Sequence, residues 1–466
     1  MKKLYYKLNL NLIKIDNWQW VIFLVSTPFF LFPGSWKSIV LLVVPILWIL
    51  SLLIGRKPIP STPLNLPILI ICLMMLVSLF ATYDIGVSLP KIAGMILGIG
   101  VFYALVNRIL LRKSLKFSLS LFFVVTLSIG VIGLFGTNWF KKVDLLQPFV
   151  SRIPLVIKGI QGAQSGIQPN ELAGSLLWVL PLLLVLIYIG LDGYKKGMIA
   201  ISRRVFFIGI SLLVIFAIFL IGVFILTQSR GGWIAMAIAL LFLVAMLIPP
   251  KKRWIYGTGL VLLGIIFVFA AWQFGLVQKI NEETTYNTDS ALSLNTLIGR
   301  EEVWSRAIYG IQDFPFTGMG MNTFRTVVDE IYPMYIINPS LDIGHAHDEF
   351  LQVALDLGIP GLIAFLAFYL VSAWMLVKTW NRSWKLERLV PEKSPTGFLA
   401  SPIVVRGLVL GLGGGLLAHA IFGLTDAVAL GAKPGILFWI LAGLIVGIYQ
   451  VVGENGSIGQ SKSTNG

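Results

Sequence analysis

Long apolar runs separated by short polar stretches dominate the hydrophobicity pattern of this 466-residue chain. Most runs are about 17–25 residues long, the length that an α-helix needs to cross the hydrocarbon core of a bilayer. The regular alternation of apolar and polar residues that a membrane barrel requires is absent from the sequence. The pattern therefore predicts an all-α polytopic membrane protein with about 12 transmembrane helices. The predicted spans are residues 18–33, 38–54, 67–82, 92–111, 117–135, 172–190, 205–226, 232–249, 254–274, 351–378, 403–424 and 435–452.

The composition agrees with this prediction. Hydrophobic residues make up 57% of the chain and charged residues 12%, whereas a soluble domain carries about 25% charged residues. Four lysines, the last of them Lys14, precede the first apolar run, but the small-residue cleavage site of a signal peptide does not follow it. The single cysteine, Cys72, lies within an apolar run, where we expect a buried small hydrophobe.

The charged residues sort by side of the membrane. With the N-terminus placed in the cytoplasm, the inner segments hold 24 of the 36 Lys and Arg and 5 of the 21 Asp and Glu. The net charge of +15 then divides into +19 on the inner side and −4 on the outer side. Cytoplasmic loops carry an excess of basic residues, so both termini are predicted to be cytoplasmic. The basic charge thus indicates membrane orientation, and no nucleic acid is expected as a partner.

Two long outer loops divide the chain. The expected parts are N-terminal transmembrane helices (1–135), a first outer loop (136–171), central transmembrane helices (172–274), a large outer loop (275–350), C-terminal transmembrane helices (351–452) and a disordered tail (453–466).

The large outer loop is predicted to contain short helices. Residues 300–311 carry apolar side chains at helical spacing, and residues 323–332 form a second candidate helix. A third helix is expected to start within the sequence HAHDEF (345–350) and to kink at Gly358 and Pro360 before it enters the membrane.

Two of the three histidines of the chain, His345 and His347, lie in HAHDEF. Three hypotheses account for them: a metal site that includes Asp348, a general base, and a solvated loop without a chemical role. The metal hypothesis is disfavoured because no other His or Cys lies in this loop, and we predict no metal. A base is favoured at His347, which we expect in the first turn of a helix, where the helix dipole disfavours imidazolium.

Two arginines of outer segments are candidates for binding an anion. Arg230 lies in a polar turn between two apolar runs, and Arg300 begins the predicted helix at 300–311. Glu301 and Glu302 suit the first turn of that helix, whereas Arg300 opposes the helix dipole there and so indicates a bound anion. Arginine prefers bidentate phosphate contacts, so this pair suits a diphosphate, although ordinary surface or interfacial positions are the alternative.

Other polar residues are candidates for supporting roles. His419 is predicted inside the span 403–424, seven residues before Asp426, so the two are expected to share a helix face. Interhelical hydrogen bonding is the alternative role for His419. Lys433 is a candidate contact for phosphate or lipid headgroups, and His345 and Asp348 lie beside the candidate base.

Three motifs resemble the O-antigen ligase/polymerase family of bacterial envelope glycosyltransferases. They are QSRGGW (228–233), GREEVW (299–304), and His347-Asp348 followed by nine residues and GIPG (358–361). The last is similar to the family signature of His, a small polar residue, nine residues and G-x-x-G. Asp348 departs from that signature, because the family usually has Asn, Ser or Gln at this position.

The resemblance implies a GT-C-like helical fold in the bacterial inner membrane and a metal-independent, inverting glycosyl transfer at its outer face. The implied donor is an undecaprenyl-diphosphate-linked glycan, and the acceptor is a glycan or a lipid. Ligases, polymerases and protein-glycosylating relatives differ in that acceptor. Carried over position by position, Arg230 and Arg300 match the diphosphate-binding arginines, and His347 matches the base. No cofactor is implied, and membrane lipids are the other expected partners.

Two other classes stay open. A multi-span transporter is one, since relatives that lack the histidine have been labelled bicarbonate transporters. Transporters usually show repeated halves, and the sequence shows no such repeat. A metal-dependent outer-face hydrolase is the other, and it would lose activity when a chelator is added.

Overall fold

The computed structural model describes residues 18–34, 37–53, 55–139, 146–159, 166–197, 202–247, 297–338, 341–389 and 401–463. Within these ranges, eight segments are helical, long and apolar enough to cross a membrane. The regular secondary structure of the same ranges is helical. The predicted all-α polytopic membrane protein is thus confirmed. The predicted span 254–274 lies outside the described residues.

The spanning segments coincide with the predicted runs. They are α4 (Ile85–Arg112), α5 (Lys116–Gly136), α7 with α8 (Pro169–Leu177 and Leu180–Lys195), α9 (Arg203–Leu226), α10 (Arg230–Leu247), α16 (Glu349–Leu389), α17 (Pro402–Phe422), and η5 with α18 (Lys433–Gly435 and Ile436–Ser463). Shorter apolar helices precede them: Trp18–Leu31, η1 with α2 (Lys37–Leu42 and Val43–Leu53), and α3 (Asn65–Ala81). α4 begins earlier than predicted because Asp84 caps its first turn, accepting a hydrogen bond from the Gly86 N–H at 2.7 Å.

The helices differ in how much of their surface they bury. In α18, 83% of the most apolar 18-residue window is buried, against 22% in α9. A helix that is apolar on all sides and buried is a core helix, so α18 lies at the centre of the bundle. α9 instead exposes large apolar side chains such as Leu212 and Ile215, which suit contact with lipid. α18 also continues to Ser463, so residues 453–463 of the predicted tail are helical.

Glycines let α17 pack closely on α8. A Cβ atom at Gly411 would lie 2.6 Å from Leu182, and one at Gly415 would lie 2.4 Å from the Trp178 carbonyl oxygen. Small residues permit such close approach between membrane helices, and the glycine-rich run 411–415 of α17 supplies them.

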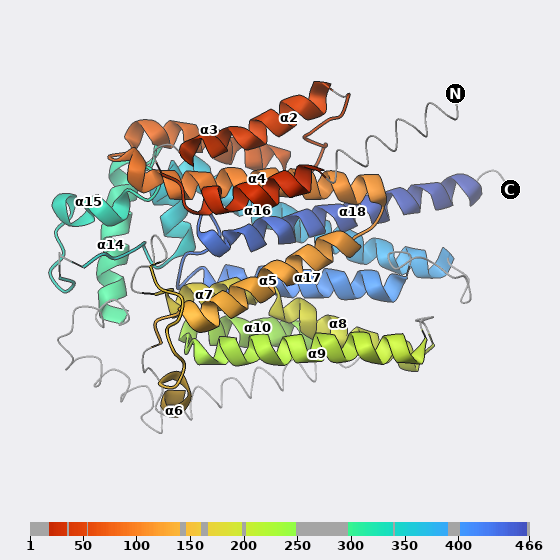
Figure 1. Cartoon of the computed structure of the whole chain (residues 1–466). Coiled ribbons are helices and arrows are strands. Elements are labelled where there is room, and N and C mark those ends of the chain that lie inside the picture. Colours follow the sequence, from red (N-terminus) through yellow and green to blue (C-terminus); the bar gives the residue numbers. More distant parts are fainter. Residues whose placement is uncertain are drawn as a thin grey trace.

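We call residues 297–338 and 341–348 the outer segment because they lie beyond one end of the helix bundle. Figure 1 shows α14 (Leu297–Asp313) and α15 (Phe324–Ile331) at this end, with the C-terminal part of α18 extending at the other. We call the end with α14 and α15 the site end. The short helices predicted in the large outer loop are therefore confirmed.

The predicted kink of α16 is also confirmed, and it anchors the outer segment. Gly358 has φ 69°, a left-handed conformation inside the helix. A Cβ atom there would lie 2.4 Å from the Phe316 carbonyl oxygen. On either side of the kink, the Ile359 N–H donates to Pro315 O and the Met319 N–H donates to Leu355 O, both at 2.7 Å. The G-x-x-G motif thus makes room for the turn between α14 and α15.

Candidate active site

The two short outer helices form a small apolar platform with α16. Val303 and Ala307 of α14 are buried with Phe324 and Val328 of α15 and Leu355 of α16. This burial stabilises α14, because the apolar stripe of the helix has a partner surface. The platform fixes the N-terminal part of α14, which carries Arg300, relative to the start of α16.

The prediction that Glu301 and Glu302 occupy the first turn of this helix is wrong, because α14 begins at Leu297. Glu302 has a different role. Its buried carboxylate accepts hydrogen bonds from the backbone N–H groups of residues 335–337 at 2.7–3.2 Å. The carboxylate therefore ties the segment after α15 to α14.

The HAHDEF segment ends in a helix cap. α16 begins at Glu349, so His347 lies two residues before the helix, and the prediction that it lies in the first turn is wrong. Asp348 occupies the cap position, where its Oδ1 accepts hydrogen bonds from the N–H groups of Phe350 (2.8 Å) and Leu351 (2.9 Å). Asn and Ser are also good helix caps, so two of the residues usual at this position could make the same capping contact as Asp348.

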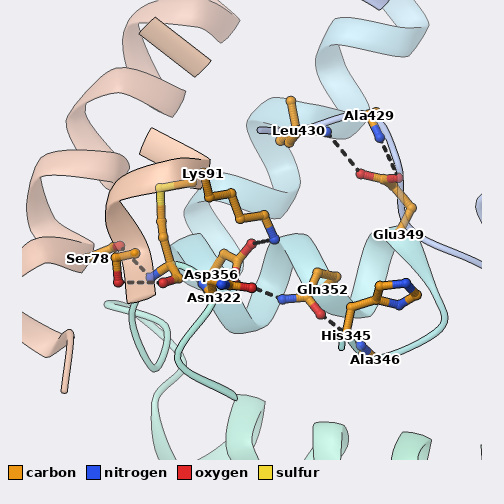
Figure 2. Close-up of polar contacts among 12 residues, drawn as sticks. Ser78, Lys91, Asn322, His345, Ala346, Glu349, Gln352, Asp356, Ala429 and Leu430 are labelled. Atoms are coloured by element: carbon orange, nitrogen blue, oxygen red, sulfur yellow. Dashed lines mark hydrogen bonds and ion pairs between the residues drawn. The ribbon is translucent and has the colours of Figure 1, made fainter. Parts of the chain in front are cut away.

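The start of α16 holds the segment that follows α17. We call residues 424–432, between α17 and η5, the 424–432 loop. The buried Glu349 carboxylate accepts hydrogen bonds from the N–H groups of residues 428–430 at 2.5–3.3 Å, in part visible in Figure 2. The Glu349 N–H in turn donates to Gly423 O at 2.6 Å. The 424–432 loop is thereby placed against HAHDEF.

This contact brings both outer histidines to Asp426. The His345 Nε2 lies 3.0 Å from Asp426 Oδ1, and the His347 Nδ1 lies 3.8 Å from the same oxygen. The two imidazole rings are edge to face, with centroids 4.5 Å apart. The His347 N–H donates to His345 Nδ1 at 3.0 Å. In neutral His345 the proton must then be on Nε2, which donates to Asp426.

The two arginines approach the same loop. Arg300 Nη1 donates to Thr425 O at 2.8 Å, while its buried Nε has no hydrogen-bond partner among the described residues. Arg230 starts α10 and is exposed. Its neighbour Gly231 packs so closely that a Cβ atom there would lie 2.3 Å from Thr425 Oγ1. Arg300 thus contacts Thr425, the residue before Asp426, and the residue that follows Arg230 packs on the same threonine.

The charges of the cluster fix its protonation. Burial, with help from His345 and Arg300, lowers the pKa of His347 to about 3, against the opposing effect of Asp426. Burial raises the pKa of Asp426, but the nearby His345, His347 and Arg300 outweigh it and hold that pKa below its ordinary value. At neutral pH the site therefore contains a neutral imidazole and an ionised carboxylate. Neither ring nitrogen of His347 makes a well-aligned hydrogen bond within the described ranges, although the Ile343 backbone lies close enough to act on the ring and raise its pKa.

The cluster resembles a metal site in composition. One ligand atom each from His345, His347 and Asp426 lie within 4.8 Å of one another. The carboxylate of this cluster belongs to Asp426. Asp348, the acid in the metal hypothesis, instead accepts a hydrogen bond from the Phe350 N–H of α16. A ligating His uses a nitrogen without a proton and donates its other N–H to a neighbour. His345 Nδ1 accepts a hydrogen bond, so Nε2 holds the proton and is a poor metal ligand.

His419 lies apart from the cluster, inside the bundle. Its Nδ1 is 3.1 Å from the Tyr369 hydroxyl oxygen, and its ring stacks on Trp178 at 4.1 Å between centroids. The prediction that His419 and Asp426 share a helix face is wrong, since α17 ends at Phe422 and Asp426 belongs to the 424–432 loop. The alternative role, a hydrogen bond between helices, is what the structure shows.

Lys433 and an acidic residue border the cluster. Lys433 Nζ lies 5.1 Å from the centroid of the Phe32 ring. Glu171, in the first turn of α7, lies within electrostatic reach of His345, Asp426 and Lys433.

Several groups that build the site were not among the predicted site residues. Glu349 binds the 424–432 loop, and the Thr425 carbonyl of that loop accepts a hydrogen bond from Arg300. Asp356 of α16 forms an ion pair with Lys91 of α4. One signal was present in the sequence: an ionisable residue inside an apolar span, as Asp356 is, usually marks function. The contacts of Thr425 carry no such signal, because a backbone carbonyl is common to every residue.

Fold and site together define a polytopic membrane protein in which a neutral histidine and an arginine lie against a loop that carries a carboxylate, next to the start of α10 with its second arginine. Residues 215–366, about a third of the chain, match the family model of the O-antigen ligase domain. This match supports the O-antigen ligase/polymerase family for the chain and confirms the resemblance found in its motifs. The matched residues include Arg230, Arg300 and His347.

A search for relatives adds one distant protein. An uncharacterized protein of Haemophilus influenzae is 24% identical over 163 residues, which are 34% of this chain and 41% of that protein. The chain thus spans less than half the length of this relative.

Proposed function

We propose that the protein transfers a glycan from an undecaprenyl-diphosphate-linked donor to an acceptor hydroxyl at the outer face of the bacterial inner membrane. The observation that carries this proposal is the meeting of His347, Asp426 and Arg300 at one loop, beside the turn that holds Arg230. A base and anion-binding groups in one site are what such a transfer needs.

The proposed step is a single displacement. The acceptor hydroxyl oxygen forms a bond to the anomeric carbon of the donor, and the bond between that carbon and the diphosphate oxygen breaks. The hydroxyl proton moves to a ring nitrogen of His347, and the electron pair of the broken bond leaves with the diphosphate. One displacement inverts the configuration at the anomeric carbon. The neutral state of the His347 ring supports its role as the proton acceptor.

The arginines are assigned to the leaving group. Negative charge grows on the diphosphate as the bond breaks, and fixed cationic donors stabilise that charge. Arg300 is held by Thr425 O through Nη1 but keeps a buried Nε–H without a partner in the described residues. Because a buried donor without a partner is costly, this group supports a ligand at Arg300. Arg230 supplies a second, exposed guanidinium.

Asp426 is assigned to stabilise the protonated base. Its carboxylate lies 3.8 Å from His347 Nδ1, and His345 holds it in place at 3.0 Å. A pKa of about 3 makes His347 a weak base in the protein alone. A bound diphosphate adds negative charge, which favours imidazolium and moves the pKa toward neutrality. The donor would thus raise the basicity of His347 when it binds.

The distribution of basic residues supports the proposed orientation. The ends of the helices opposite the site end carry basic residues of the described chain: Arg108, Arg112, Lys113, Lys195, Arg203, Arg204 and Arg382. Basic residues favour the cytoplasmic side. The site end is then on the outer face, with both termini in the cytoplasm.

The proposal is tested by envelope glycans in a host that lacks its own enzyme. His347→Ala and Arg300→Ala should each abolish the glycan product on a gel, and Arg325→Ala should not. Arg325 is a suitable control because it also lies in the outer segment but pairs with Asp342 instead of the cluster. Full product from both site variants, at equal protein level, would contradict the proposal.

A metal-dependent hydrolase is the second candidate, because His345, His347 and Asp426 lie within ligand distance of one another. The proton on His345 Nε2 argues against it. Activity of purified protein should be unchanged by EDTA. Loss of activity in EDTA and its recovery with Zn²⁺ would favour the hydrolase.

A further inference from the structure

A buried ion pair connects α4 with α16 close to the histidines. Lys91 and Asp356 form a salt bridge in which 14% and 3% of their side chains are exposed. Two charges are costly to bury, and a buried ion pair adds little net stability over apolar residues. Its presence at this position therefore calls for a role beyond stabilising the fold.

Asp356 is linked to the histidine segment through Gln352, one turn earlier in α16. The Gln352 amide donates from Nε2 to Asp356 Oδ1 at 2.9 Å, and its Oε1 accepts from the Ala346 N–H at 2.8 Å. An ionised carboxylate only accepts hydrogen bonds, so Asp356 fixes which end of the amide faces it. The oxygen of Gln352 is thereby left for Ala346. Figure 2 shows these contacts in sequence from Lys91 to Ala346.

Ala346 lies between the two histidines, and its N–H is the point at which this chain of contacts reaches them. Ala346 is fully buried. The next N–H, that of His347, donates to His345 Nδ1. His347 itself has φ 49°, a conformation that non-glycine residues adopt at a cost and keep only when their surroundings enforce it. The Gln352 contact is one of the restraints that enforce it.

We propose that Lys91, Asp356 and Gln352 are positioning residues that hold the His345-Ala346-His347 backbone in its active conformation. The inference rests on the proposed function where it concerns rate, but its structural part concerns only the two imidazole rings. The charge on Lys91 orients Asp356, Asp356 orients the Gln352 amide, and that amide holds the peptide between the histidines.

Asp356 also has a purely architectural partner, so the experiment must separate two roles. Its Oδ1 accepts from the Asn322 N–H at 2.9 Å, which fastens the turn before α15. A substitution at Asp356 alone would disturb both. Among the described residues, the Gln352 side chain makes just the two hydrogen bonds given above, so Gln352 is the better residue to change.

The first measurement uses the histidine rings themselves. The chain has three histidines, so their ¹⁵N signals are assigned by single substitutions in the protein in lipid nanodiscs. Gln352→Leu should shift the ring signals of His345 and His347 and leave His419 unchanged. The matched control is Gln450→Leu, which removes a glutamine that donates to Ser61 O from α18, at the other end of the bundle. The control should shift none of the three.

Unchanged His345 and His347 signals in Gln352→Leu would overturn the inference, whatever the activity. Should this variant not fold, Gln352→Asn serves instead, because its amide is one methylene shorter and cannot reach both Ala346 and Asp356. Shifted signals with an unchanged rate would support the positioning and count against His347 as the base. The two proposals can thus fail separately.

The second measurement is kinetic. Gln352→Leu should lower kcat about 10²-fold, because small misplacement of a reacting group has effects of this order, with KM for the donor little changed. Lys91→Met should have a similar effect, since it leaves the Asp356 charge buried without its cation. Adding Asp356→Asn to Lys91→Met keeps an oxygen for Gln352 and removes that charge. This double variant should recover most of the rate, whereas no recovery would show that Lys91 acts by another route.

Discussion

His347 and His419 are both largely buried histidines at helix ends, yet their neighbours differ in kind. His347 lies beside an ionised carboxylate and within electrostatic reach of a guanidinium. His419 stacks on Trp178 and shares a hydrogen bond with Tyr369. The comparison indicates that a histidine within an apolar span can serve packing and hydrogen bonding between helices. Charged groups from separate elements around an imidazole are the better sign of chemistry.

The largest effect is expected from replacing His347 with glutamine, and the same replacement of His419 is the comparison. His347→Gln should lower the transfer rate by about 10²–10⁴-fold, the usual contribution of a general base. His419→Gln should keep the rate per folded molecule within about 3-fold, because an amide can still bond Tyr369. Rates are measured on purified protein at equal folded concentration. Equal losses in both variants would remove the distinction drawn between the two sites.

Next in size is the effect of changing the arginine beside the cluster. Arg300→Lys keeps the charge but loses the planar set of donors, so the rate should fall about 10²-fold. Arg325→Lys is the matched control, since Arg325 lies in the same outer segment and pairs with Asp342. The same assay compares them. An Arg300→Lys protein as active as the control would show that Arg300 does not bind the leaving group.

A smaller effect is expected from Asp426→Asn. The amide oxygen can still accept from His345 Nε2, so the geometry is kept while the negative charge is lost. Without that charge the imidazolium of His347 is less stable, and the rate should fall about 10-fold. The amount of product formed after a fixed time, measured at several pH values, checks this result. An increase in rate would contradict the role assigned to Asp426.

The smallest effect on the rate is expected from lowering the pH. The pKa of His347 is lowered to about 3, so the neutral base predominates above that value and is lost only as pH falls toward it. kcat/KM, which reports the free enzyme, should therefore stay nearly constant from pH 7 to pH 5.5. An ordinary histidine would lose most of its neutral form over this range. A decline centred near pH 6.5 would show that the burial of His347 does not control its protonation.

The sequence was sufficient for the fold, because an apolar run of membrane-spanning length is a local property. It was also sufficient for the kink at Gly358 and for α14 and α15, which follow from local patterns. Their placement in predicted outer segments and their motifs single out the two arginines and His347 as candidate site residues. What the sequence does not contain is the distance between them.

The 424–432 loop shows why the remainder could not be predicted. The spacing of His419 and Asp426 suggested one continuous helix, but Gly423 ends α17 and the chain turns back toward α16. Glu349 then binds backbone N–H groups about 80 positions further along the chain. Backbone partners leave no trace in side-chain patterns. The Asp426 contact with the histidines is a consequence of this long-range bond.

The most direct test is a ¹⁵N titration of the His347 ring in lipid nanodiscs, without and with inorganic pyrophosphate. A neutral histidine that gains basicity from a bound diphosphate is the central claim. His347 should be neutral at pH 6 in the protein alone, and saturating pyrophosphate should raise its pKa in the native protein but not in Arg300→Ala. A His347 ring already protonated at pH 6, or one that pyrophosphate leaves unchanged, would contradict the account.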